Sequence, residues 1–509
     1  GGRLHAFTVF WEQVTTDRWV LDIIREGYSI EFDSSRPFYS RVRETVAPRE
    51  QMTIIMEEVE ALIQKKAIVE VQPFDTAGFY STFFVVPKKT GGMRPILNLR
   101  PLNGFIRTQH FRMDTLKSVK LAIERGWWMA SLDLKDAYLH IPIRPNHQRF
   151  LRFKVRGRTF QWRCLPFGIA TAPRVFTKVV VVLVALLREW GVTMFIYLDD
   201  ILILAESPAL VRWAVQLVVT VFTQAGFIFN VPKSEPEATQ DICYIGGRLR
   251  TDQGLVLLPR SRARDLWECL SLFRVGRYLP ARLFLRLLGL MAAAIETVPY
   301  CRLRMRPVQI FLLRMWLPRR DPLDKLVLVT FHLFKHLTWW KDPDNLFKGC
   351  PFRPPMFQRT VTTDASLNGW GGYLDGTLGV QGTWSTLQAS WHINRLELKA
   401  VLYTLMKYEG VLQGQVVQVR SDSTTVVAYI NKQGGTRSPS LCLAAWELWN
   451  WAIQREMMLV AVHVPGVSNG LADLLSRERV YPNEWSLHRN VCRQIFRRLG
   501  TPLVDWFAA

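Results

Sequence analysis

MFIYLDDILIL, residues 194–204, is the stretch around which this 509-residue sequence is organised. Its two adjacent aspartates, Asp199 and Asp200, interrupt a run of large apolar residues, a pattern that predicts two strands joined by a tight acidic turn. Isolated carboxylates are costly to bury, so a cation, most simply a divalent metal ion, is expected beside them. For the stretch taken alone, an exposed turn carrying two acids is the alternative.

The composition predicts a globular, multidomain and basic protein. Apolar residues make up 49% of the chain and charged residues 21%, which excludes a disordered chain, and the length exceeds that of one compact core. The net charge of +22 favours a polyanionic partner such as nucleic acid, with a merely basic globular protein as the alternative. Seven scattered cysteines form no CxxC pair, which predicts free thiols and an intracellular location, cytoplasm or nucleus.

The sequence carries no signal for membrane insertion. Its most apolar window, residues 179–187, is much shorter than the roughly 20 residues of a spanning helix, and Arg188 ends it. No signal peptide is visible, and the first residue is Gly1 rather than Met. We therefore expect no membrane partner, and we expect a fragment or a processed piece of a longer protein.

A second acidic strand precedes the hairpin. WMASLDLKDAYLHIPI, residues 128–143, alternates around an apolar face, reaches Asp133 at the end of the strand, and then turns through Asp136 and Tyr138. One carboxylate on this strand and a pair about 66 residues later can converge on two metal ions. Two ions roughly 3.5–4 Å apart stabilise the attacking and leaving oxygens of an in-line phosphoryl transfer.

Two further stretches predict contacts to a nucleotide. FYSTFFVVPKKTGGMRPILNLRPLN, residues 79–103, is typical of a basic hairpin that could hold a triphosphate, although such lysines are often only solvated. Its cations are Lys88, Lys89 and Arg94. CLPFGIATAPRVF, residues 164–176, predicts a loop that opens a helix, where Phe167 and Gly168 could let a base approach the backbone.

Together these motifs resemble the fingers and palm of reverse transcriptases. The resemblance implies that Asp133, Asp199 and Asp200 bind metal. It also implies that Tyr138 is the gate that excludes a ribose 2′-hydroxyl, where a core tyrosine is the alternative. Lys233, past the hairpin, would match a lysine that protonates the leaving pyrophosphate. LPFG departs from the LPQG of retroviral enzymes, and Phe is familiar there in retrotransposons.

Residues 249–350 contain 18 Lys and Arg against 8 Asp and Glu, but no chemical motif. A thumb and connection that grip a nucleic-acid backbone are one interpretation, and solvated helix faces are the alternative. The segment 343–355, with four prolines and a glycine, predicts a linker.

The second half of the chain predicts its own acidic site. Three strands within residues 360–384 precede a helix at 392–408, a strand and helix from 416, and a last strand and helix at 459–477. Acids fall at strand ends or on helices, as two-metal hydrolysis of a phosphodiester requires; they are Asp364, Glu397, Asp422 and Asp473.

This order resembles ribonuclease H, and TDAS, LEL, SDS and NGLAD match its four acid positions. Relatives often carry a catalytic histidine in the loop before the last acid. His463 instead precedes Pro465 and Gly466, and we expect it on the strand.

Connecting motifs narrow the resemblance to the reverse transcriptase–ribonuclease H region of DIRS-type, tyrosine-recombinase retrotransposons. They are HFRMDTLKSV, SLDLKDAYLHIPI, YLDD, RLRMRPVQ, NKQGGTRS and HVPG…AD.LSR. The resemblance implies an α+β multidomain chain, with a right-hand polymerase of fingers, palm and thumb followed by an α/β ribonuclease H-like domain. The expected parts are an extension at 1–40, fingers and palm at 41–248, a basic thumb and connection at 249–350, the ribonuclease H-like domain at 351–478 and a tail at 479–509.

The function so implied is RNA- and DNA-directed DNA synthesis joined to cleavage of the RNA strand of a hybrid. Two Mg²⁺ ions per active site are expected, with Mn²⁺ as an alternative. The implied partners are an RNA template, a DNA primer, an RNA–DNA hybrid, dNTPs and other retrotransposon proteins such as a tyrosine recombinase. Two alternatives stay open: a decayed or domesticated protein that binds nucleic acid without catalysis, and an RNA-synthesising polymerase, against which Tyr138 argues.

Overall fold

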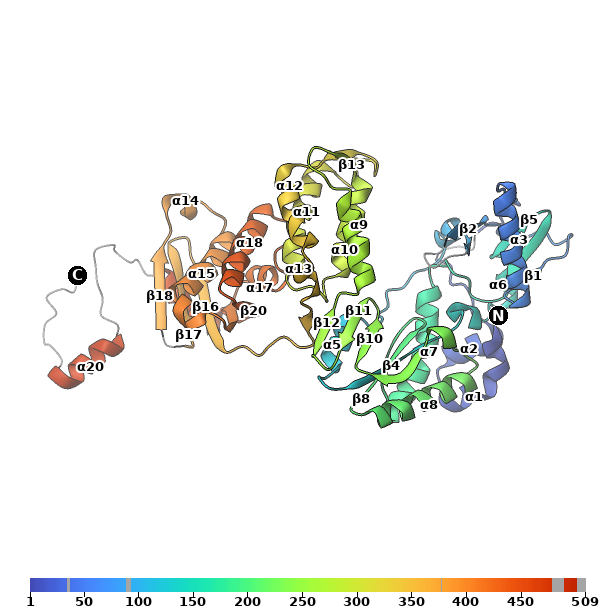
Figure 1. The fold of residues 1–509 in the computed structure, drawn as a ribbon, viewed down its shortest axis with the longest axis horizontal. Coiled ribbons are helices and arrows are strands. Elements are labelled where there is room, and N and C mark those ends of the chain that lie inside the picture. The colour runs from blue at the N-terminus through green and yellow to red at the C-terminus, as the bar shows by residue number, and fades with distance from the viewer. Residues whose placement is uncertain (34–36, 88–92, 377, 478–488, 501–509) are drawn as a thin grey trace. The chain divides into compact units, whose positions relative to one another are not determined.

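The computed structural model describes residues 1–33, 37–87, 93–376, 378–477 and 489–500. The chain forms two compact units (Figure 1). Unit 1 comprises Gly1–Arg264, Glu296–Pro299 and Asp344–Arg353. Unit 2 comprises Asp265–Ile295, Tyr300–Pro343 and Pro354–Ala509. Both mix helices with sheets, so the expected α+β class is confirmed.

The described residues of unit 1 form four sheets. Their strands are β1 (Ile68–Glu70), β2 (Phe83–Pro87), β3 (Met93–Leu97), β4 (Trp128–Asp133), β5 (Arg152–Val155), β6 (Arg158–Trp162), β7 (Thr193–Tyr197), β8 (Asp200–Ala205), β9 (Glu235–Thr239), β10 (Asp241–Tyr244), β11 (Gly247–Arg250), β12 (Leu255–Leu257) and β15 (Cys350–Pro351). The sheet orders are β7-β8-β4-β9, β10-β11-β12-β15, β1-β6-β5 and β2-β3.

Helices surround these sheets. In chain order they are η1 (Arg3–Phe7), α1 (Thr8–Val14), α2 (Arg18–Glu26), α3 (Arg49–Gln64), α4 (Arg100–Asn103), α5 (Leu116–Ala122), η2 (Ala137–His140), α6 (Pro145–Gln148), α7 (Ala172–Glu189), α8 (Pro208–Gln224), η3 (Val231–Lys233) and α13 (Pro343–Phe347), where η marks a 3-10 helix. Helix α9 (Arg260–Ser271) begins in unit 1 and ends in unit 2.

The sheet that contains the YLDD hairpin is covered on both faces. Ile201 and Ile203 of β8 belong to the main core of unit 1, whereas Leu202 and Leu204 belong to a second cluster. Alternate residues of a strand point to opposite faces, so a strand between two cores is apolar along its whole length. Each such buried side chain contributes about 1.5–3 kcal/mol to stability. The apolar run that surrounds the aspartates follows from this placement.

Unit 2 contains a five-stranded sheet, a two-stranded sheet and the remaining helices. Its strands are β13 (Tyr278–Pro280), β14 (Leu326–Leu328), β16 (Arg359–Ala365), β17 (Gly369–Leu374), β18 (Leu378–Thr383), β19 (Val416–Ser421) and β20 (Met458–His463). Its helices are α10 (Ala281–Ala293), α11 (Cys301–Met315), α12 (Phe331–Thr338), η4 (Trp339–Lys341), α14 (Thr386–Ala389), α15 (Ile393–Lys407), α16 (Glu409–Leu412), α17 (Thr424–Asn431), α18 (Pro439–Gln454), η5 (Gly466–Ser468), α19 (Gly470–Arg477) and α20 (Arg489–Leu499).

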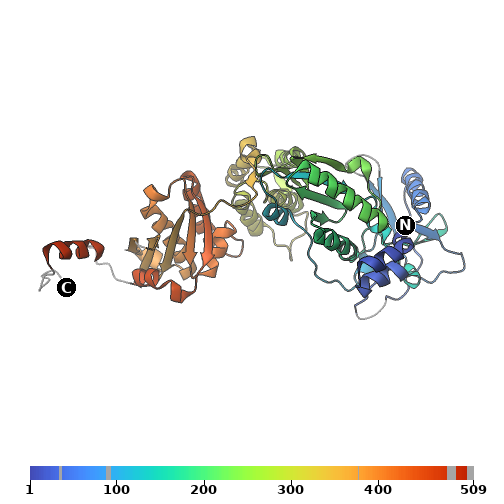
Figure 2. The same cartoon turned by 90° about the horizontal axis from the view of Figure 1, so that it is seen from below.

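The five-stranded sheet runs in the order β18-β17-β16-β19-β20. It is the orange sheet in Figure 2. Strands β16, β19 and β20 are parallel, and β17 and β18 are antiparallel to their neighbours. A Cβ on Gly371 would lie 2.5 Å from Leu475 of α19, and one on Gly372 would lie 2.4 Å from Thr404 of α15. Consecutive strand residues face opposite ways, so α15 and α19 cover opposite faces of the sheet. The predicted order of strands and helices in this half is confirmed.

Helix α11 is packed on the same body as that sheet. Leu303 of α11 shares a buried cluster with Val417 and Val419 of β19. The ring of Tyr300, just before α11, lies 5.9 Å from the ring of Trp449 in α18. The basic helices α10 and α11 and the sheet therefore belong to one unit.

The segment 343–355, predicted as a linker, is instead partly structured. It contains all of α13 and all of β15, and β15 pairs antiparallel with β12 through Val256 and Cys350. Pro343 begins α13 and Pro351 ends β15, and proline is tolerated at both kinds of position. Among the described residues, no helix is long and apolar enough to cross a membrane.

Candidate active sites

The first acidic site forms where β4, β7 and β8 end together in unit 1. Asp133, the last residue of β4, is paired directly with Asp200, the first residue of β8. Asp200 is also paired with Tyr197 of β7, which leaves Leu198 and Asp199 as the turn. Leu198 has a φ of 56°, a left-handed conformation that is uncommon for a leucine. The predicted acidic hairpin is confirmed, and its register places Asp200 beside Asp133.

The surroundings of Asp199 and Asp200 raise the pKa of both carboxyl groups. Burial raises the pKa of Asp200 to about 6, helped by the charges of Asp199 and Asp133 and opposed by Lys233. Burial also raises the pKa of Asp199, and Asp133 adds to that effect. Water is therefore partly excluded from a site where several negative charges meet, which is the condition under which divalent cations bind.

Lys233 lies beside the same acids. Its Nζ atom is 3.9 Å from Oδ2 of Asp133, and its side chain is 68% exposed. The turn that carries it is bonded to the end of β4: the N–H of Asn230 donates to the Asp133 carbonyl oxygen, at 2.7 Å. In return, the Asp133 N–H donates to Oγ of Ser234, at 3.0 Å. Sequence reasoning found Lys233 but missed Asn230 and Ser234, because backbone bonds leave no residue pattern.

Tyr138 and Phe167 face each other near this acidic cluster. Tyr138 is 7% exposed, and its ring centroid lies 5.0 Å from that of Phe167 and 5.5 Å from that of Phe176. Burial raises the pKa of Tyr138 to about 12, and the charge of Asp199 adds to that rise. Gly168 has a φ of 100°, which an L side chain rarely adopts. The structure thus brings the predicted tyrosine, phenylalanine and glycine to one place.

The remaining nucleotide-contact residues are less completely placed. Asp136 forms an ion pair with Lys65, with Nζ and Oδ2 3.0 Å apart, a pairing that the sequence did not indicate. Strands β2 and β3 form the predicted hairpin, with Val86 opposite Arg94. Lys88 and Lys89 lie outside the described residues, as does the side chain of Arg94.

The second acidic site lies at the carboxyl ends of parallel strands in unit 2. Asp364 lies on β16, Asp422 directly follows β19, and Glu397 lies on α15. One carboxylate oxygen of each lies within 4.8 Å of the others. Within the described part of the chain, no other three His, Cys, Asp or Glu side chains meet at this spacing. Three of the four acids predicted for this half are therefore brought together.

Asp473 is the fourth predicted acid, and it is engaged differently. It lies on α19, where its Oδ1 accepts a hydrogen bond from Nε of Arg477, at 2.7 Å. It is still close enough for its charge to contribute to the raised pKa of Asp364. Asp473 is therefore beside the cluster without belonging to its three closest carboxylates.

Among the clustered acids, Glu397 has the most strongly raised pKa. Burial, followed by the charges of Asp364 and Asp422, raises its pKa to about 9. Its Oε2 atom is buried and has no hydrogen-bond partner. Burial likewise raises the pKa of Asp364 to about 6, although a hydrogen bond from Ser476 opposes the rise. A buried acceptor without a donor is costly, and a cation between the three carboxylates would remove that cost.

Two polar residues beside Asp364 were not found from the sequence. Oγ of Ser476 donates to Oδ2 of Asp364 at 2.7 Å, and Nδ2 of Asn469 donates to Oδ1 at 3.4 Å. Asn469, Asp473 and Ser476 are spaced i, i+4, i+7, which places them on one helical face. That spacing in NGLADLLSR is the signal that could have found them.

His463 is the last residue of β20, so the expected strand position is confirmed. Its Nε2 atom lies 3.1 Å from the backbone carbonyl oxygen of Asp422. The imidazole therefore contacts the segment that carries one of the clustered acids.

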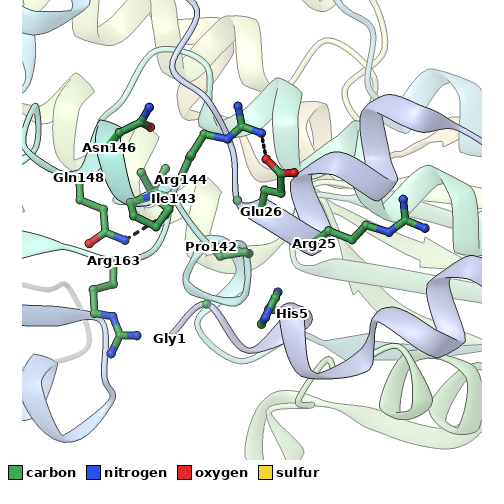
Figure 3. Close-up of a pocket in the computed structure, with 13 residues that line it drawn as sticks. Gly1, His5, Arg25, Glu26, Pro142, Ile143, Arg144, Asn146, Gln148 and Arg163 are labelled. Atoms are coloured by element: carbon green, nitrogen blue, oxygen red, sulfur yellow. Dashed lines mark hydrogen bonds and ion pairs between the residues drawn. The ribbon is translucent and has the colours of Figure 1, made fainter.

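A separate cavity of about 660 Å³ lies near the start of the chain in unit 1 (Figure 3). Its lining includes His5, Arg25, Arg144 and Arg163, and Arg144 is ion-paired with Glu26 across it. None of the predicted site residues lines this cavity.

Comparisons with known proteins agree with this geometry. A family model described as "Reverse transcriptase (RNA-dependent DNA polymerase)" matches residues 86–249. The genome polyprotein of Petunia vein clearing virus (isolate Shepherd) is 26% identical over 140 residues, 27% of this chain and 6% of that protein. The transposon Tf2-3 polyprotein of Schizosaccharomyces pombe is 29% identical over 161 residues, 32% of this chain and 12% of that protein. The chain thus matches only a small part of these relatives.

Solved structures extend the likeness over most of the chain. A foamy viral protease–reverse transcriptase in complex with double-stranded DNA has a TM-score of 0.55 at 15% identity, covering 90% of this chain and 81% of that one. Its counterpart with an RNA/DNA hybrid has a TM-score of 0.55 at 15% identity, covering 91% and 60%. The expected α+β multidomain fold is confirmed, and it is consistent with that of a right-hand polymerase. Residues 86–249 of this chain form a reverse transcriptase domain of the kind found in retroelement polyproteins.

Proposed function

We propose that this chain is an RNA- and DNA-directed DNA polymerase joined to a ribonuclease that cuts the RNA strand of RNA–DNA hybrids. The observation that carries the proposal is that acids meet at the end of a sheet in each of two separate units: Asp133 is paired with Asp200 in unit 1, and three carboxylates lie close together in unit 2. Its substrates would be an RNA template, a DNA primer, dNTPs and the resulting hybrid. A hybrid-cutting site is useful where a polymerase makes hybrids, so each half supports the other.

The residues at both sites fit divalent cations. All seven predicted ligands are carboxylates, the oxygen donors that Mg²⁺ prefers, and Glu397 offers a buried oxygen without another partner. Asp133, Asp199 and Asp200 would hold the ions of the polymerase, and Asp364, Glu397, Asp422 and Asp473 those of the nuclease. When bound, two Mg²⁺ or Mn²⁺ ions at each site would stabilise the attacking and leaving oxygens of phosphoryl transfer.

Other side chains would select and orient the nucleotide. The ring of Tyr138, fixed between Phe167 and Phe176, would occupy the space of a ribose 2′-hydroxyl. Lys233, beside Asp133, would donate a proton toward the leaving pyrophosphate. The basic hairpin with Lys88, Lys89 and Arg94 would hold the triphosphate, and Asp136 and Gly168 would contact the nucleotide.

The biological setting belongs to the same proposal. The chain would serve replication of a DIRS-type retrotransposon inside the cell, with a tyrosine recombinase among its partners. The domain boundaries predicted from the sequence, 1–40, 41–248, 249–350, 351–478 and 479–509, are proposed with it.

Primer extension on poly(rA)/oligo(dT) with Mg²⁺ and dTTP, run alongside cleavage of a labelled RNA–DNA hybrid, tests this function. We expect Asp133→Asn to abolish extension and to leave cleavage intact, and Glu397→Gln to do the reverse. Each variant is thus the matched control for the other. Tight hybrid binding by the unaltered protein without either activity would instead support a decayed element that binds nucleic acid.

A further inference from the structure

His140 is a buried histidine in unit 1 to which the proposed function gives no role. It is 3% exposed and ends η2, the short helix that carries Tyr138. Its Nδ1 atom lies 2.9 Å from the Ala137 carbonyl oxygen, and its Nε2 atom lies 3.1 Å from the N–H of Ile228. A carbonyl needs a donor and an N–H needs an acceptor, so the proton is on Nδ1 and the ring is neutral. Burial, which lowers the pKa of His140 to about 4, keeps it neutral.

The bond to Ile228 joins η2 to the segment that leads to Lys233. The Ile228 carbonyl oxygen accepts from the N–H of Lys135, at 2.8 Å. Two residues later, the N–H of Asn230 donates to the Asp133 carbonyl oxygen, and η3 then carries Lys233 to its place beside Asp133. His140 is therefore the side chain that ties η2 to this segment.

Ring contacts run back from His140 to Tyr138. The ring of His140 lies 5.1 Å from that of Phe227, Phe227 lies 6.1 Å from Phe176, and Phe176 lies 5.5 Å from Tyr138. Together with the bond to Ala137, these contacts close a loop that begins and ends at η2. Tyr138 is thus held from one side by packed rings and from the other by its own short helix.

We infer that His140 is a positioning residue for sugar selection: it fixes the turn that carries Tyr138 relative to Asp133 and Lys233. This inference rests on the proposed polymerase function and on Tyr138 as its gate. A steric gate rejects a 2′-hydroxyl only if its ring cannot retreat, and the loop through His140 prevents that retreat. A purely structural histidine would instead affect stability alone.

Amide side chains can separate the two bonds of His140. Glutamine places its amide at about the reach of Nε2, so His140→Gln keeps an acceptor for Ile228. Asparagine reaches only about as far as Nδ1, so His140→Asn keeps the bond to Ala137 and leaves the N–H of Ile228 without an acceptor. His140→Leu removes both bonds.

The measurement is the ratio of kcat/KM for dTTP to kcat/KM for UTP during extension of oligo(dT) on poly(rA). We expect His140→Asn and His140→Leu to lower this ratio by about tenfold, the size expected when one buried N–H loses its acceptor. His140→Gln should stay close to the unaltered protein. Thermal unfolding of each variant reports stability separately, and the comparison of Gln with Asn holds even if the leucine variant fails to fold.

Tyr138→Ala, measured in the same way, separates the two ways in which the inference can fail. An unchanged ratio in Tyr138→Ala overturns the gate and the inference with it. A lowered ratio in Tyr138→Ala, together with unchanged ratios in all His140 variants, overturns the inference and leaves the gate standing. If the unaltered protein extends the primer with neither dTTP nor UTP, the polymerase proposal itself is overturned.

Discussion

Glu397 is a carboxyl group whose burial should make the stability of unit 2 depend on pH. Its pKa in the folded protein, about 9, lies far above the ordinary value of 4.5. The folded state therefore binds the proton more tightly, and the stability that this gives is present at low pH and is lost as the pH rises through 9. Asp364, with a pKa raised to about 6, contributes in the same sense at lower pH.

We therefore expect the melting temperature of the metal-free protein to decrease as the pH rises from about 5 to about 9. Added Mg²⁺ should raise it more at the alkaline end, because metal and protons compete for the same oxygens. Differential scanning fluorimetry in EDTA measures the first effect and the same scan in excess Mg²⁺ without EDTA measures the second, with Glu397→Gln as the control. A pH dependence that is identical in the control would contradict the raised pKa.

Ser476 should tune the ionisation of Asp364. Its hydroxyl donates to Oδ2 of that carboxylate and so favours the charged form. In Ser476→Ala we expect the acid limb of the pH profile for hybrid cleavage to move to higher pH. One lost hydrogen bond is worth about 1 kcal/mol, so the shift should be below about one pH unit. Ser468→Ala, an exposed serine nearby, is the control and should not move the limb.

At the level of single residues, the acids of the two sites were predictable from the sequence. The residues that hold the sites in place through hydrogen bonds were not. Asp133 and Asp200 stood out because charges interrupt apolar strands, and Asp364 because it is a charge within a strand. Asn230, Ser476 and His140 act through hydrogen bonds between segments distant in sequence, which no local pattern encodes. The same reason explains why the pairing of Asp136 with Lys65 was not foreseen.

Helices and strands were predicted best where a regular pattern of apolar residues ends at a polar turn. The hairpin of β7 and β8 was recognised because two apolar runs flank a two-residue polar break. Gly371 and Gly372 lie within β17, where helices approach the strand from both faces. Close packing of this kind depends on tertiary structure and leaves only the glycines as a trace.

The NKQGGTRS motif has a packing role at the end of α17. Arg306 of α11 donates to the carbonyl oxygens of Lys432 and Gly434, both at 3.1 Å. Oε1 of Gln433 accepts from the N–H of Leu303 at 3.1 Å, in the first turn of α11, where helices leave such groups unpaired. The motif therefore fastens the basic helix α11 to the body of unit 2.

Arg306→Ala should consequently destabilise unit 2. It leaves two carbonyl oxygens without a donor, and we expect a loss of about 1–3 kcal/mol. Urea unfolding followed by tryptophan fluorescence measures the change, with Arg314→Ala, an exposed arginine of the same helix, as the control. Equal midpoints for the two variants would argue against the fastening.

At the level of the whole molecule, the two units interleave along the chain. The sequence indicated two acidic centres with separate folds, but it did not reveal that residues 344–353 return to unit 1. Prolines at 351, 354 and 355 suggested a linker, and strand pairing between β12 and β15 is a long-range event that composition does not report.

Truncation of the chain should show how much residues 344–353 contribute to the stability of unit 1. A chain ending at residue 353 keeps β15 and Phe352, which is 5% exposed in the second core of unit 1, whereas one ending at 343 loses both. We expect the shorter chain to unfold at a lower temperature. Its free energy of unfolding should be smaller by about 3–5 kcal/mol, the cost of losing a buried aromatic ring. Phe352→Ala in the full chain should reproduce much of the loss. Equal melting temperatures for the two truncated chains would show that β15 is dispensable.

Strand β15 also determines when unit 1 can finish folding during synthesis. Its partner β12 ends at Leu257, and the ribosome must deliver helices α10, α11 and α12 before Cys350 and Pro351 emerge. At about 5–20 residues per second, this interval lasts roughly 5–20 s. During that time the edge of β12 can pair with other chains. Nascent molecules, rather than finished ones, are thus the form of this protein that most needs a chaperone.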